Sequence, residues 1–114
     1  MPDNRKKIFV ELPRVTKFFE SQPVEVRDEY DLIVDELELA GNLSMPKAEK
    51  IAGENLFAIR VIRAGNVRVF YVYGLDKYVY GISGYVKKTR QIPDAEMNQA
   101  RRIIKLLKQE NLVK

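Results

Sequence analysis

Four cations interrupt or follow the apolar, strand-like segments in the second half of the sequence. Arg60 and Arg68 lie within two of these segments, and Lys87 and Lys88 follow the third. If the first two segments form a hairpin, Arg60 and Arg68 share one face, and like charges placed together are unfavourable unless an anion separates them. Each arginine could instead pair with a carboxylate from the first half of the chain, or point to solvent. We favour an anion-binding site.

Further residues around these cations have the chemistry of a polyanion binder. The run Lys-Lys-Thr-Arg at 87–90 places basic and hydroxyl groups directly after a strand, which suits phosphate binding. The aromatic residues of the same region are Tyr71, Tyr73, Tyr78, Tyr80 and Tyr85. Tyrosines can stack on bases of single-stranded RNA, but they are also ordinary residues of β-sheets, and we expect at least three of the five to be so.

The absence of cysteine and histidine excludes several kinds of chemistry. Without Cys there are no disulfides, thiolate metal sites or cysteine nucleophiles. Without His, the commonest acid–base group near neutral pH and the commonest metal ligand are missing. No Asp/Glu group has metal-ligand spacing, and the Gly-Ile-Ser-Gly segment at 81–84 is not a phosphate loop. Proton transfer must therefore use Lys, Tyr, Asp, Glu or water, and we expect neither a metal nor a cofactor.

The formal net charge of +4 is unevenly distributed along the 114 residues. Residues 1–57 carry a net charge of −4 and residues 58–114 a net charge of +8. This asymmetry indicates a surface for nucleic acid, an acidic protein or anionic lipid, although solvated helix and strand faces would give the same pattern. No segment approaches the 20 apolar residues of a spanning helix, and no export signal is recognisable. We therefore expect a cytoplasmic protein.

The first half predicts one short strand and two helices. Residues 7–11 read as a strand, and Pro13 suits the first turn of a short helix ending near residue 21. A second helix begins at Pro23, and its apolar stripe repeats at helical spacing through Val26, Tyr30, Ile33, Leu37 and Ala40. Gly41 and Asn42 end that helix. Its outer side is acidic, and residues 43–53, with Lys47 and Lys50, read as a loop.

The second half predicts three strands and a basic helix. The strands cover 56–63, 67–73 and 78–86, with turns at 64–66 and 74–77. Short connections predict an antiparallel meander. A helix from Pro93 to about residue 111 carries Arg101 and Arg102 on its basic side. The order β-α-α-β-β-β-α predicts a single α+β domain over residues 1–114, with one sheet face packed on the helices and the other partly open.

The ordered motifs of residues 41–102 resemble those of the HigB-like toxins in the RelE/HigB superfamily of type II toxin–antitoxin systems, which includes phage-derived relatives. The matching segments are Gly-Asn-Leu-Ser-Met-Pro-Lys at 41–47, Lys-Ile-Ala-Gly at 50–53, Leu-Phe-Ala-Ile-Arg at 56–60, Val-Arg-Val-Phe-Tyr at 67–71 and Gly-Tyr-Val-Lys-Lys-Thr at 84–89. A proline and an Ala-Arg helix follow, as in the family. Each segment is weak alone, but their order is specific.

The resemblance implies a RelE-like fold and a metal-independent endoribonuclease that cuts mRNA on the translating ribosome. Its partners would be mRNA, small-subunit rRNA and a cognate antitoxin, a helix-turn-helix DNA-binding protein, with no membrane partner. The implied reaction is attack of the ribose 2′-hydroxyl on the adjacent phosphorus. Cations placed beforehand around the phosphorane would lower the barrier.

The resemblance also assigns roles to individual residues. The implied catalytic set comprises Arg68, Arg60, Lys87, Lys88 and Tyr85, and the implied RNA contacts comprise Lys47, Lys50, Tyr71, Arg90, Arg101 and Arg102. Arg68 is the first choice for stabilising the phosphorane, and Arg60 the second. Two positions depart from the family pattern, because Ala58 stands where a Glu is often found and Tyr85 replaces a Phe.

Two other functions are compatible with the sequence. A non-catalytic RNA- or ribosome-binding module could use the same basic face, since Ala58 removes one carboxylate and no acid–base pair is obvious. An interaction protein could instead use a groove for a partner helix or strand. Salt-sensitive RNA binding without cut ends would indicate the first, and a stable protein complex that leaves RNA binding unchanged would indicate the second.

Overall fold

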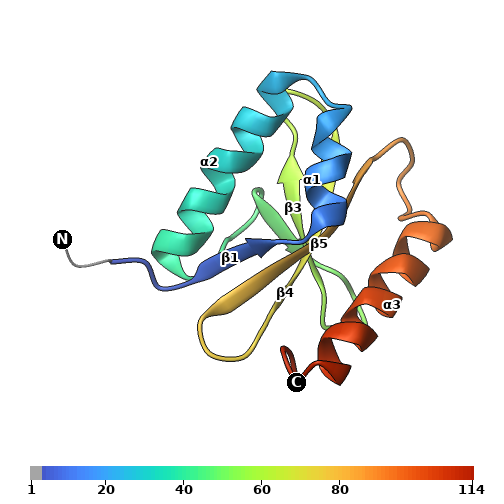
Figure 1. Ribbon diagram of the computed structural model, residues 1–114. Coiled ribbons are helices and arrows are strands. Elements are labelled where there is room, and N and C mark those ends of the chain that lie inside the picture. The colour runs from blue at the N-terminus through green and yellow to red at the C-terminus, as the bar shows by residue number, and fades with distance from the viewer. Residues whose placement is uncertain (1–3) are drawn as a thin grey trace.

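Within residues 4–114, five strands and three helices make up the fold. The structure, a computed structural model, describes residues 4–114. In chain order the elements are β1 (Ile8–Glu11), α1 (Pro13–Glu20), α2 (Val24–Ala40), β2 (Ala48–Lys50), β3 (Phe57–Val61), β4 (Val67–Tyr73), β5 (Tyr78–Val86) and α3 (Asp94–Gln109) (Figure 1). The predicted α+β class and order of the helices and longer strands are confirmed.

The strands form one sheet in the order β1-β5-β4-β3-β2. Strands β3, β4 and β5 make the predicted antiparallel meander. Two features were not predicted. β1 joins the sheet parallel to β5, and β2, which lies within the segment expected to be a loop, pairs with β3 as an edge strand. Three residues are too few for a recognisable alternation, so β2 carried no clear signal.

The sheet is covered on both faces. Helices α1 and α2 pack on one face around Val15, Tyr30 and Leu37, and α3 packs on the other through Met97 and Ala100 (Figure 1). The expectation of a partly open face is therefore wrong for β4 and β5, whereas Arg60 of β3 and Glu49 of β2 remain half-buried on the α3 face. The sequence of β4 explains the cover on both sides of this strand, because its residues apart from Arg68 are apolar in both phases of the strand alternation.

A β-bulge divides β5 into two phases. Phe70 of β4 pairs with Ser83, whereas the next residue, Tyr71, pairs with Gly81, so Ile82 is the extra residue. An extra residue reverses which side chains face each side of the sheet. Without it Tyr85 would point toward α1. With it, Tyr85 lies on the α3 face, together with Tyr80 and Ile82.

Carboxylates of α2 bind backbone groups of the sheet. Glu29 accepts hydrogen bonds from the N–H groups of Ile62, Arg63 and Ala64, at the end of β3. Glu38 is buried and accepts one from the N–H of Phe9 in β1. These bonds connect α2 to the edge strand β1 and to the end of β3, and they satisfy N–H groups that have no strand partner.

Gly84 permits α1 to approach β5, next to the site described below. A Cβ at this position would lie 2.6 Å from Cδ2 of Phe18 and 3.1 Å from its Cγ. We therefore expect Gly84→Ala to lower the free energy of unfolding by about 1–3 kcal/mol, the usual cost of overpacking, measured by urea denaturation. Adding Phe18→Leu should recover part of the loss, and a Gly84→Ala variant as stable as the parent would contradict this packing.

Candidate active site

Arg60 and Arg68 lie directly opposite each other on β3 and β4, as the sequence predicted. They project from the α3 face of the sheet. The Arg68 side chain is the less accessible of the two, with the residue only 4% exposed. Its burial and the neighbouring positive charge of Arg60 both lower the pKa of Arg68. The hairpin thus holds a buried guanidinium beside a second one, which is the arrangement that favours a bound anion.

Glu49 of β2 supplies the carboxylate nearest to these arginines. Its Oε1 lies 3.6 Å from Nε of Arg68, an ion pair too long for a hydrogen bond. Glu49 is also the register partner of Ala58, the position where the resemblance leads one to expect a Glu. The carboxylate missing from β3 is therefore provided by the adjacent strand. Sequence reasoning missed Glu49 because it lay in a predicted loop.

Backbone and amide groups hold the two guanidinium groups in place. Arg68 Nη1 donates to Oδ1 of Asn66 at 3.1 Å and to the carbonyl of Val67 at 3.2 Å. Arg60 Nη1 donates to the carbonyl of Pro46 at 3.1 Å. Within residues 4–114, the buried Nε groups of both arginines lack a hydrogen-bond acceptor. Each guanidinium therefore retains a buried donor that an anion could satisfy.

Tyr85 lies on the opposite side of Arg68 from Glu49. It is the register partner of Arg68 on β5, is 6% exposed, and packs at a tilt against Phe70. Burial raises the pKa of Tyr85, and the carboxylates of Glu49 and Glu96 raise it further, against the opposing effect of Arg68. Its hydroxyl is therefore protonated at neutral pH and can donate a hydrogen bond.

The lysines after β5 extend the site. The N–H of Lys87 donates to the carbonyl of Asn66, and the Asn66 amide donates to the carbonyl of Lys87, both at 2.8 Å. The same Asn66 orients Arg68, so this residue connects the two cations. Strand alternation places Lys87, which is half-buried, on the side of Tyr85. Lys88 and Arg90 follow in an exposed loop.

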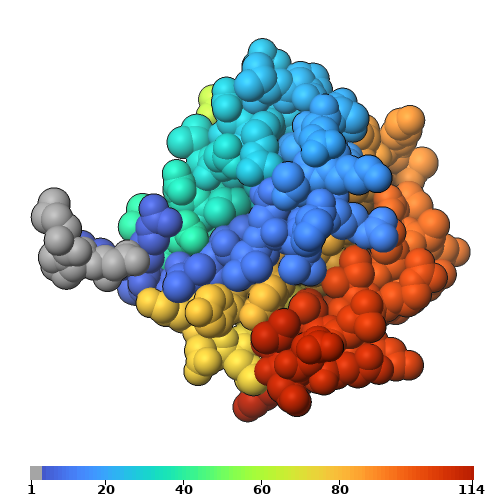
Figure 2. Space-filling model, viewed as in Figure 1, coloured from blue at the N-terminus to red at the C-terminus, as the bar shows by residue number. Residues whose placement is uncertain are grey.

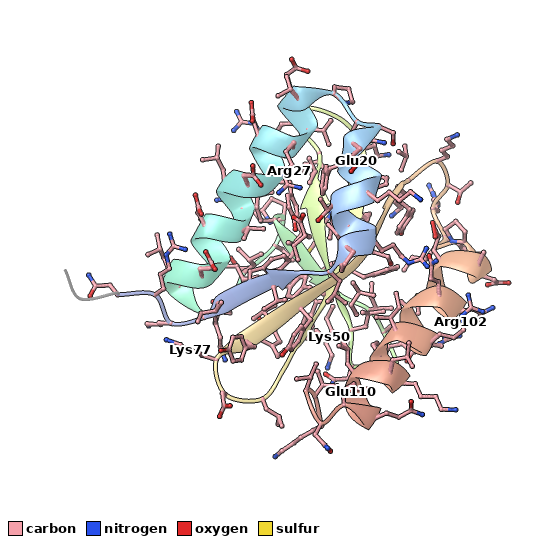
Figure 3. All side chains as sticks on the ribbon, viewed as in Figure 1. Glu20, Arg27, Lys50, Lys77, Arg102 and Glu110 are labelled. Carbon is pink, nitrogen blue, oxygen red and sulfur yellow. The ribbon has the colours of Figure 1, made fainter. Side chains whose placement is uncertain are left out.

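Most of the other residues expected to bind RNA lie away from this site, although Lys47 lines a pocket with Arg60. Lys47 forms an ion pair with Glu36 of α2 at 2.7 Å, and Lys50, one residue out of phase with Glu49, projects from the other side of β2. Arg101 pairs with Glu54. Arg102 is exposed on the outer side of α3 (Figure 3).

Tyr71 requires a correction. It was expected to bind RNA, but it is 1% exposed and lies under α1 and α2, stacked on Phe57 with ring centroids 5.5 Å apart. Burial raises its pKa. Because β4 alternates strictly through this region, Tyr71 faces away from Arg68 and is a core residue rather than a stacking platform.

A comparison with known protein families identifies the chain. The sequence profile of the Gp49-like phage-derived proteins matches residues 17–105. The chain belongs to the Gp49-like family. This family is related to the RelE/HigB toxins of toxin–antitoxin systems, and such a family implies an antitoxin protein as a partner. A comparison with curated proteins finds no significant match.

The matched residues of this Gp49-like protein include every strand of the candidate site. Among residues 4–114, no three His, Cys, Asp or Glu side chains are grouped so that they could hold a metal ion, and no helix is long and apolar enough to cross a membrane. The cations available at the site are the guanidinium and ammonium groups described above. They make it suited to binding a phosphate group and to stabilising negative charge.

Inorganic phosphate tests this site without any assumption about catalysis. Compared with chloride at equal ionic strength, phosphate should raise the melting temperature, because a ligand that binds only the folded state stabilises it. At a phosphate concentration ten times Kd the gain is about 1.4 kcal/mol. Glu49→Gln should enlarge the shift, since it removes the charge that competes with the anion for Arg68.

Two variants control this measurement. Glu20→Gln, which removes an exposed carboxylate from the end of α1, should leave the phosphate effect as in the parent, and Arg60→Gln/Arg68→Gln should abolish it. Equal shifts for the Glu49→Gln and Glu20→Gln proteins would show that phosphate does not bind between the two arginines.

Proposed function

We propose that this protein is the toxin of a type II toxin–antitoxin system and that it cleaves mRNA on translating ribosomes in the cytoplasm. The observation that carries this proposal is the opposed pair Arg60 and Arg68, with Glu49 on one side and Tyr85 on the other. Family membership and the resemblance to HigB-like toxins support it. The antitoxin would be a helix-turn-helix DNA-binding protein, and small-subunit rRNA would bind the basic surface.

The proposed reaction is transfer of a phosphodiester to the neighbouring ribose hydroxyl. The 2′-oxygen forms a bond to phosphorus, the bond from phosphorus to the 5′-oxygen breaks, and a 2′,3′-cyclic phosphate remains. Glu49 accepts the proton of the 2′-hydroxyl. Arg68 and Arg60 bind the non-bridging oxygens and stabilise the extra negative charge of the phosphorane.

The order of the strands supports this division of roles. In the sheet, β2 with Glu49 and β5 with Tyr85 lie on opposite sides of the two arginine strands. Attacking and leaving oxygens lie roughly in line across a reacting phosphorus, so a proton acceptor and a proton donor are required on opposite sides. Tyr85, whose hydroxyl is protonated, and Lys87, which follows it, can supply a proton to the leaving 5′-oxygen; Lys88 would add positive charge.

Arg68→Ala should reduce RNA cleavage about 10²- to 10³-fold, the scale of losing one donor to a transition-state oxyanion. The chain and its variants would be expressed in a bacterium and cut sites mapped by primer extension on one abundant mRNA. Arg63→Ala, which removes an exposed arginine from the adjacent turn, should cleave as the parent does. A thermal melt and the Arg68→Lys variant separate loss of chemistry from loss of folding.

Three outcomes of that experiment are informative. New frame-dependent 5′ ends with the parent and not with Arg68→Ala support the proposed toxin. Cleavage by Arg68→Ala at the parent rate contradicts the role of Arg68. Growth arrest and salt-sensitive RNA binding without new ends would favour the non-catalytic RNA-binding module.

Glu49→Gln separates proton transfer from binding. We expect kcat to fall about 10²- to 10⁴-fold, the usual contribution of a general base, while RNA binds as tightly as to the parent or more tightly, because a negative charge beside the phosphate is removed. Single-turnover cleavage and binding of an uncleavable 2′-O-methyl RNA provide the two readouts. Glu20→Gln is the matched control, and a Glu49→Gln protein with unchanged kcat would exclude Glu49 as the base.

A further inference from the structure

A second cationic surface lies along the C-terminal half of α3. A groove of about 260 Å³ separates this part of the helix from the end of β4 and from the β2–β3 connection. Lys105 and Lys108 line one side, Asn55 lines the other, and Ile104, Val72 and Val113 contribute apolar surface. In Figure 2, α3 and the C-terminal residues form one flank of the molecule, next to the β4–β5 turn.

The charges of this groove are poorly compensated within the described chain. Lys105 and Lys108 are exposed, and the ammonium group of neither forms an ion pair or hydrogen bond within residues 4–114. Arg101 precedes Lys105 by one turn of the helix, and Lys108 follows it by three residues. Like charges at these spacings repel each other. Glu54, whose carboxylate also lines the groove, is already bound by Arg101 Nε at 2.8 Å.

The groove follows the candidate active site along the same helix. Glu96, in the first turn of α3, is close enough to Tyr85 to affect its pKa. From Glu96 to Lys105 the helix rises about 13 Å. The pair Arg101 and Glu54 joins α3 to the β2–β3 connection between these two points. A ligand that extends along α3 from the arginines would therefore reach the groove.

We propose that this groove binds the single-stranded RNA that flanks the phosphodiester held at Arg60 and Arg68. A backbone phosphate binds to Lys105 and Lys108, and the attached base packs on the half-buried Ile104, with the exposed Asn55 amide available to its polar edge. Apolar surface bordered by cations fits a nucleotide, which has a flat base and a charged phosphate. The inference rests on the proposed function in that RNA is the ligand of the first site.

Oligonucleotide length provides the test. Binding of uncleavable 2′-O-methyl RNA would be measured by fluorescence anisotropy for a trinucleotide and for the same trinucleotide extended on its 5′ or its 3′ side. In the parent, extension on one side should tighten binding about tenfold. Lys105→Ala/Lys108→Ala should bind the trinucleotide as the parent does. It should lose the length gain, by which we mean the increase in affinity when the trinucleotide is extended.

Salt dependence gives a second readout. Removing the two lysines that bind one backbone phosphate should reduce the slope of log K against log salt by about 0.7 for the extended RNA, the value for one neutralised phosphate on a single strand. Arg14→Ala/Lys17→Ala is the matched control, because it removes two exposed cations at the same spacing from α1. This control should retain the length gain.

The outcomes distinguish the groove from the proposed function. If Lys105→Ala/Lys108→Ala keeps the parent's length gain, or if the parent shows no gain, the groove does not bind RNA. If acidic polyglutamate displaces the extended RNA as effectively as unlabelled RNA does, the groove is a surface for an acidic protein and the inference fails. If the length gain depends on both lysines but the parent cuts no RNA, the groove binds RNA as proposed and the nuclease proposal fails.

Discussion

The rest of the site depends on the electrostatic repulsion between Arg60 and Arg68, which lie opposite each other on neighbouring strands. Two guanidinium groups on neighbouring strands repel, and burial of Arg68 removes the water that would screen them. The fold retains the pair by adding Glu49 from the edge strand and acceptors from the carbonyl groups around it. These groups do not satisfy every donor of the two guanidinium groups, since both Nε groups remain without a hydrogen-bond acceptor in the described chain. A substrate phosphate would satisfy them.

Two departures from regular β-structure create the surroundings of that pair. The bulge at Ile82 changes the phase of β5, so that Tyr85 and then Lys87 reach the α3 face beside Arg68. The short strand β2 adds Glu49 at the other side. Both changes are small, one residue and three residues, yet each decides which functional group faces the arginines. Bulges often occur where a sheet must redirect a side chain toward a site.

These departures also explain what the sequence could and could not predict. Long periodic segments, such as the stripe from Val26 to Leu37, predicted the helices well, and the turn after β3 correctly placed Arg60 opposite Arg68. The sequence could not reveal the bulge, because Ile82 fits a regular strand equally well. Tyr71 was misplaced for a related reason: its type suits both base stacking and a core, and only the sheet register decides between them. Glu49 became recognisable only once β2 was paired.

The division of charge along the chain has a structural explanation. Several carboxylates of the first half form contacts within the fold. Glu29 and Glu38 accept hydrogen bonds from backbone N–H groups, and Glu36 forms an ion pair with Lys47. They stabilise the helical layer on one face of the sheet and do not neutralise the opposite face. Several cations of the second half, among them Arg60, Arg68 and Arg101, lie on the α3 side, where Glu49 pairs with Arg68 and Glu54 pairs with Arg101. The net charge of +4 therefore understates the positive potential on the α3 face, the surface that a polyanion would meet.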